Sequence, residues 1–447
     1  MTYFTKPFFT LVFAIADIYP LVILLDVIGI IMILFKERFE PRTFVLWLMI
    51  IIVLPVAGFL LYLVLGCTLY STKRFDRKAE ADRVILSEVP EDAVHGLDMG
   101  DGLDYATKGN DVRAYWNIGD FHDDAVADIR SAKASVLVEI RKVPRRSFEE
   151  IADALCDAAS RGVDVRVITG SYGFGRTYGI RSIVSAGGHF TTFHSRFYST
   201  FSLKNSNRLL RGVIVIDGAI AYSGTESVVR VEGPAACRLA KRFAADWSFR
   251  TGESFDVDVM SGSHGSDIVQ ITSGGPDVGG EGPPVSEYMS LIMGAKERIY
   301  MTFEYLVPNE VLYNSMRLAV FSGAEVHLII PRRGRHWYQA WNSLSASNEL
   351  MLAGVHVYFT DKRTMRNVIV CDGKMCSVGS AVFNTRSMRY DFTTNVLAFS
   401  ESLASQLEGF FREELRSAME CHPEEYADRS FADKLKIVFS RMMMFFN

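Results

Sequence analysis

Two stretches of this sequence, one in each half of the chain, end in nearly the same phrase. Residues 213–218 read VIVIDG and residues 368–373 read VIVCDG. Each phrase is followed by a short apolar run that ends in a glycine, Gly224 or Gly379. A phrase that recurs together with its surroundings indicates an internal repeat, in which two similar units pack on each other. The chain is therefore expected to fold as a duplicated structure.

The segments before each phrase also match in pairs. Residues 125–140 are similar to residues 288–303, and residues 154–169 are similar to residues 314–330. Each segment contains an amphipathic helical pattern followed by an apolar strand. Helices that alternate with apolar strands favour an α/β fold whose strands are covered on both faces. We therefore predict an α/β sandwich of two repeats related by a pseudo-twofold axis.

The N-terminal part of the chain is strongly apolar. A first run at about 8–35 holds only two charged residues, and a second at about 44–66 holds none. Since roughly 20 apolar residues span a bilayer, these runs predict a transmembrane helical hairpin. A cleaved signal peptide is disfavoured, because the first run leads straight into the second. More Lys and Arg follow the second run than lie between the runs, which places the globular part in the cytoplasm.

These patterns predict the following division of the chain: transmembrane hairpin, residues 1–70; juxtamembrane linker, 71–112; repeat 1, 113–252; linker, 253–284; repeat 2, 285–425; amphipathic C-terminal helix, 426–447. The C-terminal helix has apolar residues at helical spacing with Lys and Arg among them. It is expected to pack either on the globular domain or on a membrane. The six cysteines are scattered without metal-ligand spacing, so no metal and no cofactor are predicted.

Several local phrases together carry a resemblance to a known family. They are LPVAGF at residues 54–59, FAADW at 243–247, YLVPNE at 305–310 and VGSA at 378–381. With these phrases, almost the whole chain resembles the bacterial cardiolipin synthases of the phospholipase D superfamily. The resemblance implies two phospholipase D-like repeats and anionic phospholipids, such as phosphatidylglycerol or cardiolipin, as partners. It gives no indication of a nucleic-acid partner.

In that family each repeat carries a His-x-Lys-x4-Asp motif, and both motifs meet at one pocket. The resemblance implies that one histidine attacks the phosphodiester, the other protonates the leaving alcohol, and the lysines neutralise the phosphate. Here neither histidine and neither lysine is present. The residues at the His, Lys and Asp positions are Leu210, Gly212 and Asp217 in the first motif and Met365, Asn367 and Asp372 in the second.

Further positions implied by the family pattern also differ. The asparagine expected after each glycine is Ser227 or Val382, and the acidic residue expected in the second half is Asn384. The two retained aspartates stand in Asp-Gly pairs between apolar strands, which is typical of a hairpin turn. The degenerate motifs therefore predict a noncatalytic protein that binds anionic phospholipid or pairs with an active relative. Two alternatives stay open: an active cardiolipin synthase that uses non-standard residues, and a structural membrane scaffold.

Basic residues follow two predicted strands where a ligand site is expected in an open α/β sheet. Guanidinium groups suit phosphate, so these residues are candidates for lipid binding. They are equally consistent with a solvated basic rim that faces an anionic membrane. The candidates are Arg141, Lys142, Arg145, Arg146, Arg332, Arg333 and Arg335.

A histidine pair that has moved to other positions would keep an enzyme possible. Such a pair would have to face one phosphate from opposite sides. The histidines within the two repeats are His122, His189, His194, His327, His336 and His356.

Overall fold

The computed structural model describes residues 20, 23–31, 33–34, 41–62, 69–89, 93–98, 105–142, 148–170, 179–194, 207–257, 264–278, 282–307, 309–334, 336–424 and 429–443. Its contacts divide the chain into two units. The described residues up to Lys73 belong to the first unit, and those from Arg74 onward belong to the second.

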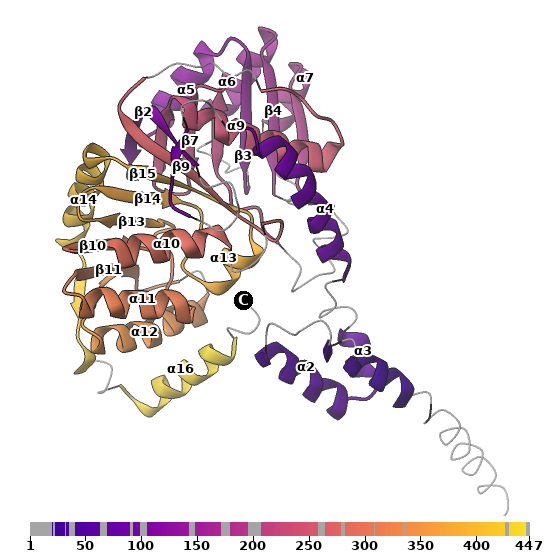
Figure 1. Cartoon of the computed structure of the whole chain (residues 1–447), viewed down its shortest axis with the longest axis vertical. Coiled ribbons are helices and arrows are strands. Elements are labelled where there is room, and N and C mark those ends of the chain that lie inside the picture. Colours follow the sequence, from indigo (N-terminus) through magenta and orange to yellow (C-terminus); the bar gives the residue numbers. More distant parts are fainter. Residues whose placement is uncertain are drawn as a thin grey trace, which may run out of the picture. The chain divides into compact units, whose positions relative to one another are not determined.

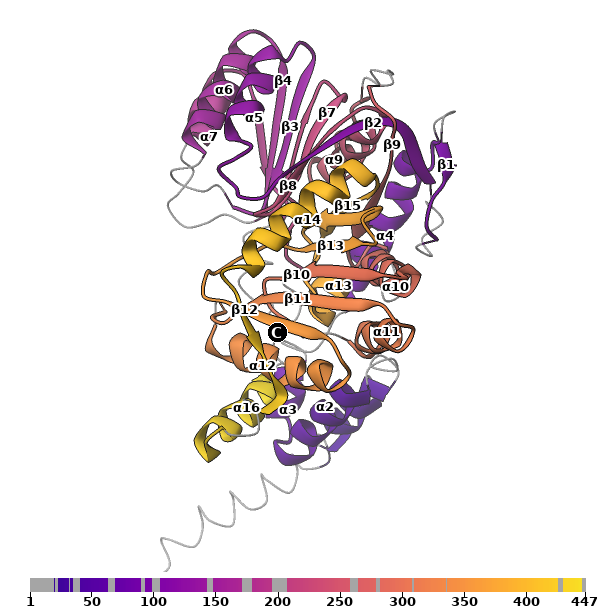
Figure 2. The same ribbon diagram turned by 90° about the vertical axis from the view of Figure 1, so that its left-hand side faces the viewer.

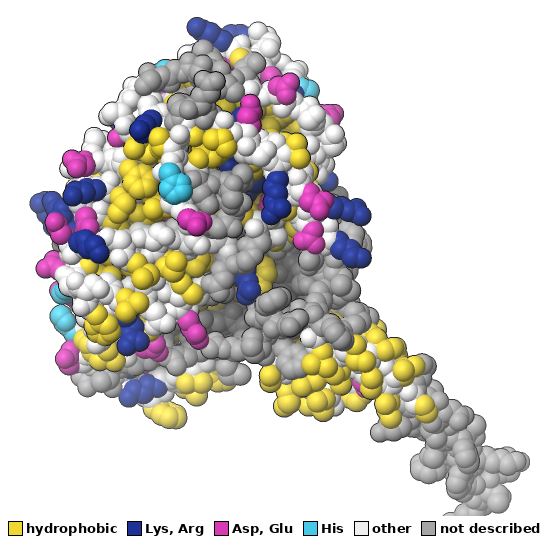
Figure 3. Space-filling view, viewed as in Figure 1, with side chains coloured by type: hydrophobic (Ala, Val, Ile, Leu, Met, Phe, Trp, Pro, Cys, Tyr) yellow, Lys and Arg dark blue, Asp and Glu magenta, His cyan; other side chains and the backbone are white. Residues whose placement is uncertain are grey.

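The first unit is a small cluster of short apolar helices. It contains helical residues 23–31 and 33–34, helix α2 (Pro41–Val53) and helix α3 (Ala57–Leu61). Its buried centre is made by Ile33, Trp47, Ile51 and Tyr62. Hydrophobic side chains cover much of its visible surface (Figure 3).

The predicted membrane spans at 8–35 and 44–66 are not supported by the structure, and residues 8–19, 21–22, 32, 35 and 63–66 of these runs lie outside the described residues. Within the described residues, no helix is long and apolar enough to cross a membrane. The second run is broken between α2 and α3, where Pro55 cannot donate a helical hydrogen bond and disfavours helical geometry at Leu54. The next residue, Val56, has a positive φ of 59°, and its N–H donates to Asp26 Oδ1 at 3.0 Å. Hydropathy alone therefore missed a sharp turn inside an apolar run.

The second unit contains one mixed sheet. Among the described residues it has the order β16-β12-β11-β10-β13-β14-β15-β9-β2-β8-β7-β6-β3-β4-β5, with β1 paired to β2. The strands are β1 (Ala93–His95), β2 (Tyr105–Tyr115), β3 (Ser135–Ile140), β4 (Asp164–Thr169), β5 (His189–Thr192), β6 (Val213–Ile216), β7 (Ile220–Gly224), β8 (Val228–Glu232), β9 (Asp267–Gly274), β10 (Arg298–Thr302), β11 (Glu325–Pro331), β12 (His356–Thr360), β13 (Val368–Cys371), β14 (Met375–Gly379), β15 (Thr393–Phe399) and β16 (Met419–Cys421).

The strand order agrees with the predicted duplication. Reading outward from the central β2–β9 pair, one half runs β2-β8-β7-β6-β3-β4-β5 and the other runs β9-β15-β14-β13-β10-β11-β12. The strands of the two VIVxDG phrases, β6 and β13, hold equivalent places in these series. Each pairs antiparallel with the strand of the matching helix–strand segment, β3 or β10. The predicted domain boundaries remain a prediction.

Helices cover both faces of the sheet in each half (Figures 1 and 2). Alternate residues of β6 and β13 pack on opposite helical layers, which explains why these strands are apolar throughout. In the first half, one face is covered by α5 (His122–Ser131), α6 (Glu149–Ser160) and α7 (Ile180–Ser185). The other face is covered by α9 (Pro234–Thr251), and Phe75 of α4 (Leu69–Leu86) packs on the same face. In the second half, α10 (Pro283–Gly294), α11 (Glu310–Phe321) and α12 (Trp337–Leu352) cover one face, and α14 (Glu401–Leu415) covers the other. Two further helices are α13 (Thr385–Tyr390) and α16 (Phe431–Met443).

Candidate functional site

The aspartate of each motif ends its strand and closes a tight turn. Asp217 and Asp372 have φ values of 50° and 52°, and the glycine after each also has a positive φ. The Asp217 carboxylate accepts backbone hydrogen bonds from the start of β3, and Asp372 accepts them from the start of β10 at 2.8–2.9 Å. Burial opposes ionisation of Asp372, but the three backbone donors lower its pKa below the usual value. The predicted turn role of both residues is confirmed.

The lysine position of the first motif has no room for any side chain. A Cβ atom placed on Gly212 would lie 2.2 Å from the carbonyl oxygen of Gly224. The two residues are drawn together because the Gly224 N–H donates to the Gly212 carbonyl at 3.0 Å. At the histidine position, the half-buried Leu210 donates its N–H to the Phe392 carbonyl at 2.8 Å. This strand end is therefore packed against backbone from both halves of the sheet.

The histidine position of the second motif is tied directly to the first half. The Met365 N–H donates to Glu226 Oε2 at 2.5 Å, and the Met365 carbonyl accepts from Thr225 Oγ1 at 2.7 Å. Asn367, at the lysine position, is buried, and its Oδ1 has no hydrogen-bond partner among the described residues. Residues that follow the first repeat's glycine thus bond to the second motif across the two halves.

The remaining positions implied by the family pattern have structural partners. Ser227 Oγ donates to the Trp116 carbonyl at 3.1 Å, and Val382 is a buried apolar residue. The Asn384 side chain caps α13 by accepting from the Ser387 N–H at 2.7 Å. Its Nδ2 donates to Tyr305 Oη at 2.9 Å. These side chains make protein contacts at the positions where the family pattern implies phosphate ligands.

The middle residue of each motif is a buried arginine that crosses between the halves. Arg211 donates to the carbonyls of Thr393 (3.3 Å) and Gly274 (3.4 Å) in the second half and pairs with Asp246 of α9. Because it alternates with Leu210 and Gly212 along the chain, it points to the opposite face of the sheet.

Arg366 is the equivalent residue of the second motif. It donates to the Trp116 carbonyl at 3.1 Å and to Asn117 Oδ1 at 2.7 Å, both in the first half. It also pairs with Glu226 at 3.0 Å and with Glu414 of α14 at 3.2 Å. The acidic partners of the two arginines stand at matching places, three residues after Phe243 and Phe411 in FAADW and FREEL. The matching acidic residues are present in the sequence, but their pairing with Arg211 and Arg366 was not predicted.

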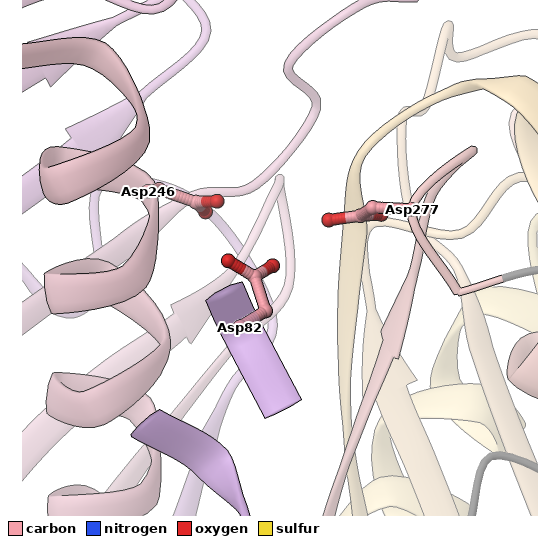
Figure 4. A group of neighbouring side chains, drawn as sticks. All are labelled: Asp82, Asp246 and Asp277. Carbon is pink, nitrogen blue, oxygen red and sulfur yellow. The ribbon is translucent and has the colours of Figure 1, made fainter. Parts of the chain in front are cut away.

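Asp246 belongs to a buried group of charges that joins three parts of the second unit. Figure 4 shows Asp82 of α4, Asp246 of α9 and Asp277 after β9 turned toward one another. The buried Lys78 ammonium lies 2.8 Å from Asp246 and 2.8 Å from Asp277 and also contacts Asp82. Arg242 pairs with the same three carboxylates. We call these residues, together with Arg211, the buried charge cluster.

Carboxylate oxygens of the three aspartates lie within 4.8 Å of one another, a spacing that suits a metal ion. Lys78, Arg211 and Arg242 supply three positive charges beside these three negative charges. Burial alone would lower the pKa of Lys78, yet the surrounding carboxylates raise it above its usual value. Since protein cations already balance the carboxylates, this group is explained as an ion-pair network.

Glu139 of β3 lies beside this cluster and differs from the other acidic residues. It is buried, and its Oε1 lies 3.9 Å from Arg211 Nη1. Burial, followed by the charge of Asp246, raises its pKa from 4.5 to about 8. Glu139 therefore keeps its proton at neutral pH, which leaves the cluster balanced.

Replacing Glu139 with glutamine is expected to change how stability depends on pH. Between pH 4.5 and 8, the unfolded chain loses the Glu139 proton while the folded chain keeps it. Folding stability therefore falls as pH rises through this window, by at most about 1.4 kcal/mol per pH unit. Glutamine removes this dependence, so thermal unfolding midpoints at a series of pH values should decline less in the variant. Parallel declines in the two proteins would show that Glu139 is ionised in the fold.

Four of the seven basic residues predicted at strand ends are among the described residues. Arg141 and Lys142 follow β3, and Arg332 and Arg333 follow β11. Arg332 lies 3.8 Å from Asp361, and its Nη2 contacts the Met419 sulfur at 3.3 Å. Arg145, Arg146 and Arg335 lie outside the described residues.

Partners are seen for His327, His356 and His194. His327 and His356 stack on neighbouring strands β11 and β12 with ring centroids 5.0 Å apart, and His356 Nδ1 lies 3.0 Å from Glu420. His194 is buried against the Asn207 carbonyl, and burial lowers its pKa to about 4. The contacts of Leu210, Met365 and Asn367 described above involve no imidazole.

Two family models match parts of the chain, and curated relatives match nearly all of it. A family model described as "Cardiolipin synthase, PLD-like domain" matches residues 288–415, and one described as "Phospholipase_D-nuclease N-terminal" matches residues 24–66. The chain is 27% identical to a cardiolipin synthase 2 of Staphylococcus epidermidis, covering 94% of this chain and 96% of that protein. It is 25% identical to a cardiolipin synthase of Clostridium perfringens, covering 91% and 94% respectively. A cardiolipin synthase of Staphylococcus aureus is 27% identical, with 92% of each chain covered.

A solved structure supports the fold independently. The crystal structure of a phosphatidylserine synthase from Haemophilus influenzae matches with a TM-score of 0.56, covering 82% of this chain and 98% of that one. The sequence identity is 10%, so this likeness concerns the fold alone. Together with the mixed sheet, it confirms the predicted phospholipase D-like α/β fold.

Proposed function

This chain belongs to the bacterial cardiolipin synthase family of the phospholipase D superfamily, and we propose that it is a noncatalytic, membrane-attached member. Its role in this proposal is to bind anionic phospholipid, such as phosphatidylglycerol or cardiolipin. It also acts as a regulatory partner, and the protein that it binds is expected to be an active relative. Its N-terminal unit attaches it to the membrane, and its globular part lies on the cytoplasmic side.

The observation that carries this proposal is the packing at Gly212. Capture of a phosphoryl group needs a nucleophile, and the charge that develops on the phosphate needs a nearby cation. At Gly212 the backbone approach to Gly224 leaves no space for a lysine or any other side chain. Leu210 and Met365 offer no nucleophile at the two histidine positions. The missing space for a lysine at position 212, in addition to the missing histidines and lysines, supports a noncatalytic role.

The proposed lipid ligands are the basic residues that follow β3 and β11. Guanidinium forks bind phosphate oxygens in pairs, so they can hold a headgroup without cleaving it. The proposed residues are Arg141, Lys142, Arg145, Arg146, Arg332, Arg333 and Arg335.

An active cardiolipin synthase is the second candidate, because the similarity to cardiolipin synthases extends over about nine-tenths of the chain. In that case the protein would transfer a phosphatidyl group between two phosphatidylglycerol molecules and release glycerol. Non-standard residues would have to supply the nucleophile and the acid.

The two candidates are separated by glycerol release from phosphatidylglycerol vesicles that contain the purified full-length protein. We expect none from this chain, because neither motif offers an imidazole or an ammonium group. Glycerol release that is lost on replacing His336 or another native histidine with alanine would contradict the proposal. An active relative, assayed in the same vesicles, serves as the positive control.

Lipid binding is tested separately by the phosphatidylglycerol that stays bound through purification in detergent. Replacing Arg332 and Arg333 with glutamine is expected to reduce the bound lipid. The matched control replaces the exposed Arg412 and Arg416 of the α14 region. Equal loss in both variants would contradict a specific site after β11.

A further inference from the structure

The C-terminal helix α16 docks on the second unit by one face only. Ile437 and Ser440 are buried, and Ile437 joins the hydrophobic core that contains α12. The Lys436 ammonium lies 5.1 Å from the centre of the Trp341 ring on α12 and 2.9 Å from Asp433 Oδ1. These contacts fix which face of α16 points inward, and both ribbon views show the helix beside α12 (Figures 1 and 2).

The opposite face of α16 is apolar and exposed. Phe431, Leu435, Val438 and Phe439 follow one another at helical spacing and are between 48% and 82% exposed. We call these four residues the α16 stripe. Ile437 and Ser440 lie on the other side of the helix, so docking on α12 leaves the stripe uncovered. Large apolar side chains gathered on one exposed face indicate an interaction surface.

Basic residues flank the stripe. Residues 429–443 contain Arg429, Lys434, Lys436 and Arg441 against the single acidic residue Asp433, a formal charge of +3, although the whole chain carries −4. Figure 3 shows apolar and basic side chains beside one another where Figure 1 places α16. An apolar stripe with cationic flanks matches the boundary between the headgroups and acyl chains of an anionic bilayer.

We infer that α16 is a second membrane contact, which inserts its stripe into the interface of an anionic bilayer while its other face holds the globular unit. At 13 residues the helix is too short to span a bilayer and instead lies in its plane. A second copy of this chain fits less well, because two stripes in contact would bring two segments of charge +3 together. This inference goes beyond the proposed function, since it assigns a lipid contact to a different surface from the strand-end residues.

Amide hydrogen exchange of the full-length protein tests the inference. The protein is compared in phosphatidylcholine vesicles and in vesicles that also contain phosphatidylglycerol. Exchange within residues 431–443 is expected to slow by about tenfold or more in the anionic vesicles, since insertion of the stripe excludes water. Replacing Leu435 and Phe439 with glutamine should abolish this slowing. Replacing Lys434 and Arg441 with glutamine should remove the difference between the two lipids.

The matched control replaces Leu318 and Phe321, two exposed apolar residues of α11, with glutamine and should leave the slowing intact. Exchange in α12 reports whether α16 still docks in each variant, so loss of the helix is distinguished from loss of insertion. Equal exchange in both lipids would overturn the inference. So would protection that depends on protein concentration in detergent without lipid, which would indicate pairing of two copies. Neither result bears on glycerol release, so the proposed function is tested separately.

Discussion

Replacing Lys78 with methionine should destabilise the second unit by about 3–5 kcal/mol, because it leaves buried carboxylates without a partner charge. The Lys78 ammonium contacts Asp82, Asp246 and Asp277, and none of these side chains has substantial access to water. Methionine keeps most of the volume of the lysine stem, so the loss reports the charge. The measurement is the urea midpoint of the purified protein in a non-ionic detergent, followed by tryptophan fluorescence.

Lys241 provides the matched control for Lys78. It forms one ion pair, with the well-exposed Glu88 at 2.6 Å, and its replacement by methionine should cost less than about 1 kcal/mol. A double variant, Lys78→Met with Asp82→Asn, should recover part of the lost stability, because it removes one unbalanced carboxylate. If Lys78→Met lowers stability no more than Lys241→Met, water or ions must reach the buried charge cluster and screen its carboxylates.

Replacing Arg366 with methionine is the second change with a large expected effect, again about 3–5 kcal/mol. This guanidinium joins Glu414 of α14 to Trp116, Asn117 and Glu226 of the other half of the sheet. Its removal leaves Glu414 and Glu226 facing each other without their shared cation. Urea unfolding measures the loss, and exchange of the β2 and β13 amides shows whether the two halves separate before each half unfolds.

Arg412 is the control for Arg366, since it pairs with Glu408 at 2.7 Å but is 58% exposed. Its replacement by methionine should change stability by less than about 1 kcal/mol. An unchanged urea midpoint for Arg366→Met would show that this guanidinium does not help to hold the two halves together.

These two arginines explain how the fold can persist without the residues expected for catalysis. In each motif, the positions expected to carry His and Lys point to one face, and the arginine between them points to the other. Arg211 and Arg366 contact the other half through their own side chains, and these contacts use no side chain of the His and Lys positions. The absence of the expected histidines and lysines therefore does not remove the arginine contacts between the halves.

Much of the architecture could be predicted from local patterns. The recurrence of VIVxDG placed β6 and β13 correctly, because four consecutive apolar residues are stable only when both faces of a strand are covered. The Asp-Gly pairs predicted turns, since glycine tolerates a positive φ and aspartate accepts local backbone hydrogen bonds. The predicted membrane spans find no support among the described residues, and hydropathy does not register the turn at Pro55 that breaks the second of them.

The sequence by itself determined the duplication, the family resemblance and the residue types at the motif positions, because each depends on the order of side chains along the chain. Only the tertiary structure decided that Gly212 has no room for a side chain, since the obstructing carbonyl belongs to a neighbouring strand. Only the tertiary structure brought Lys78 to Asp246 and Asp277, and Arg366 to Glu414, across long sequence separations. The energy of a buried ion pair depends on which charges lie together after water has been excluded, and the folded structure determines those neighbours.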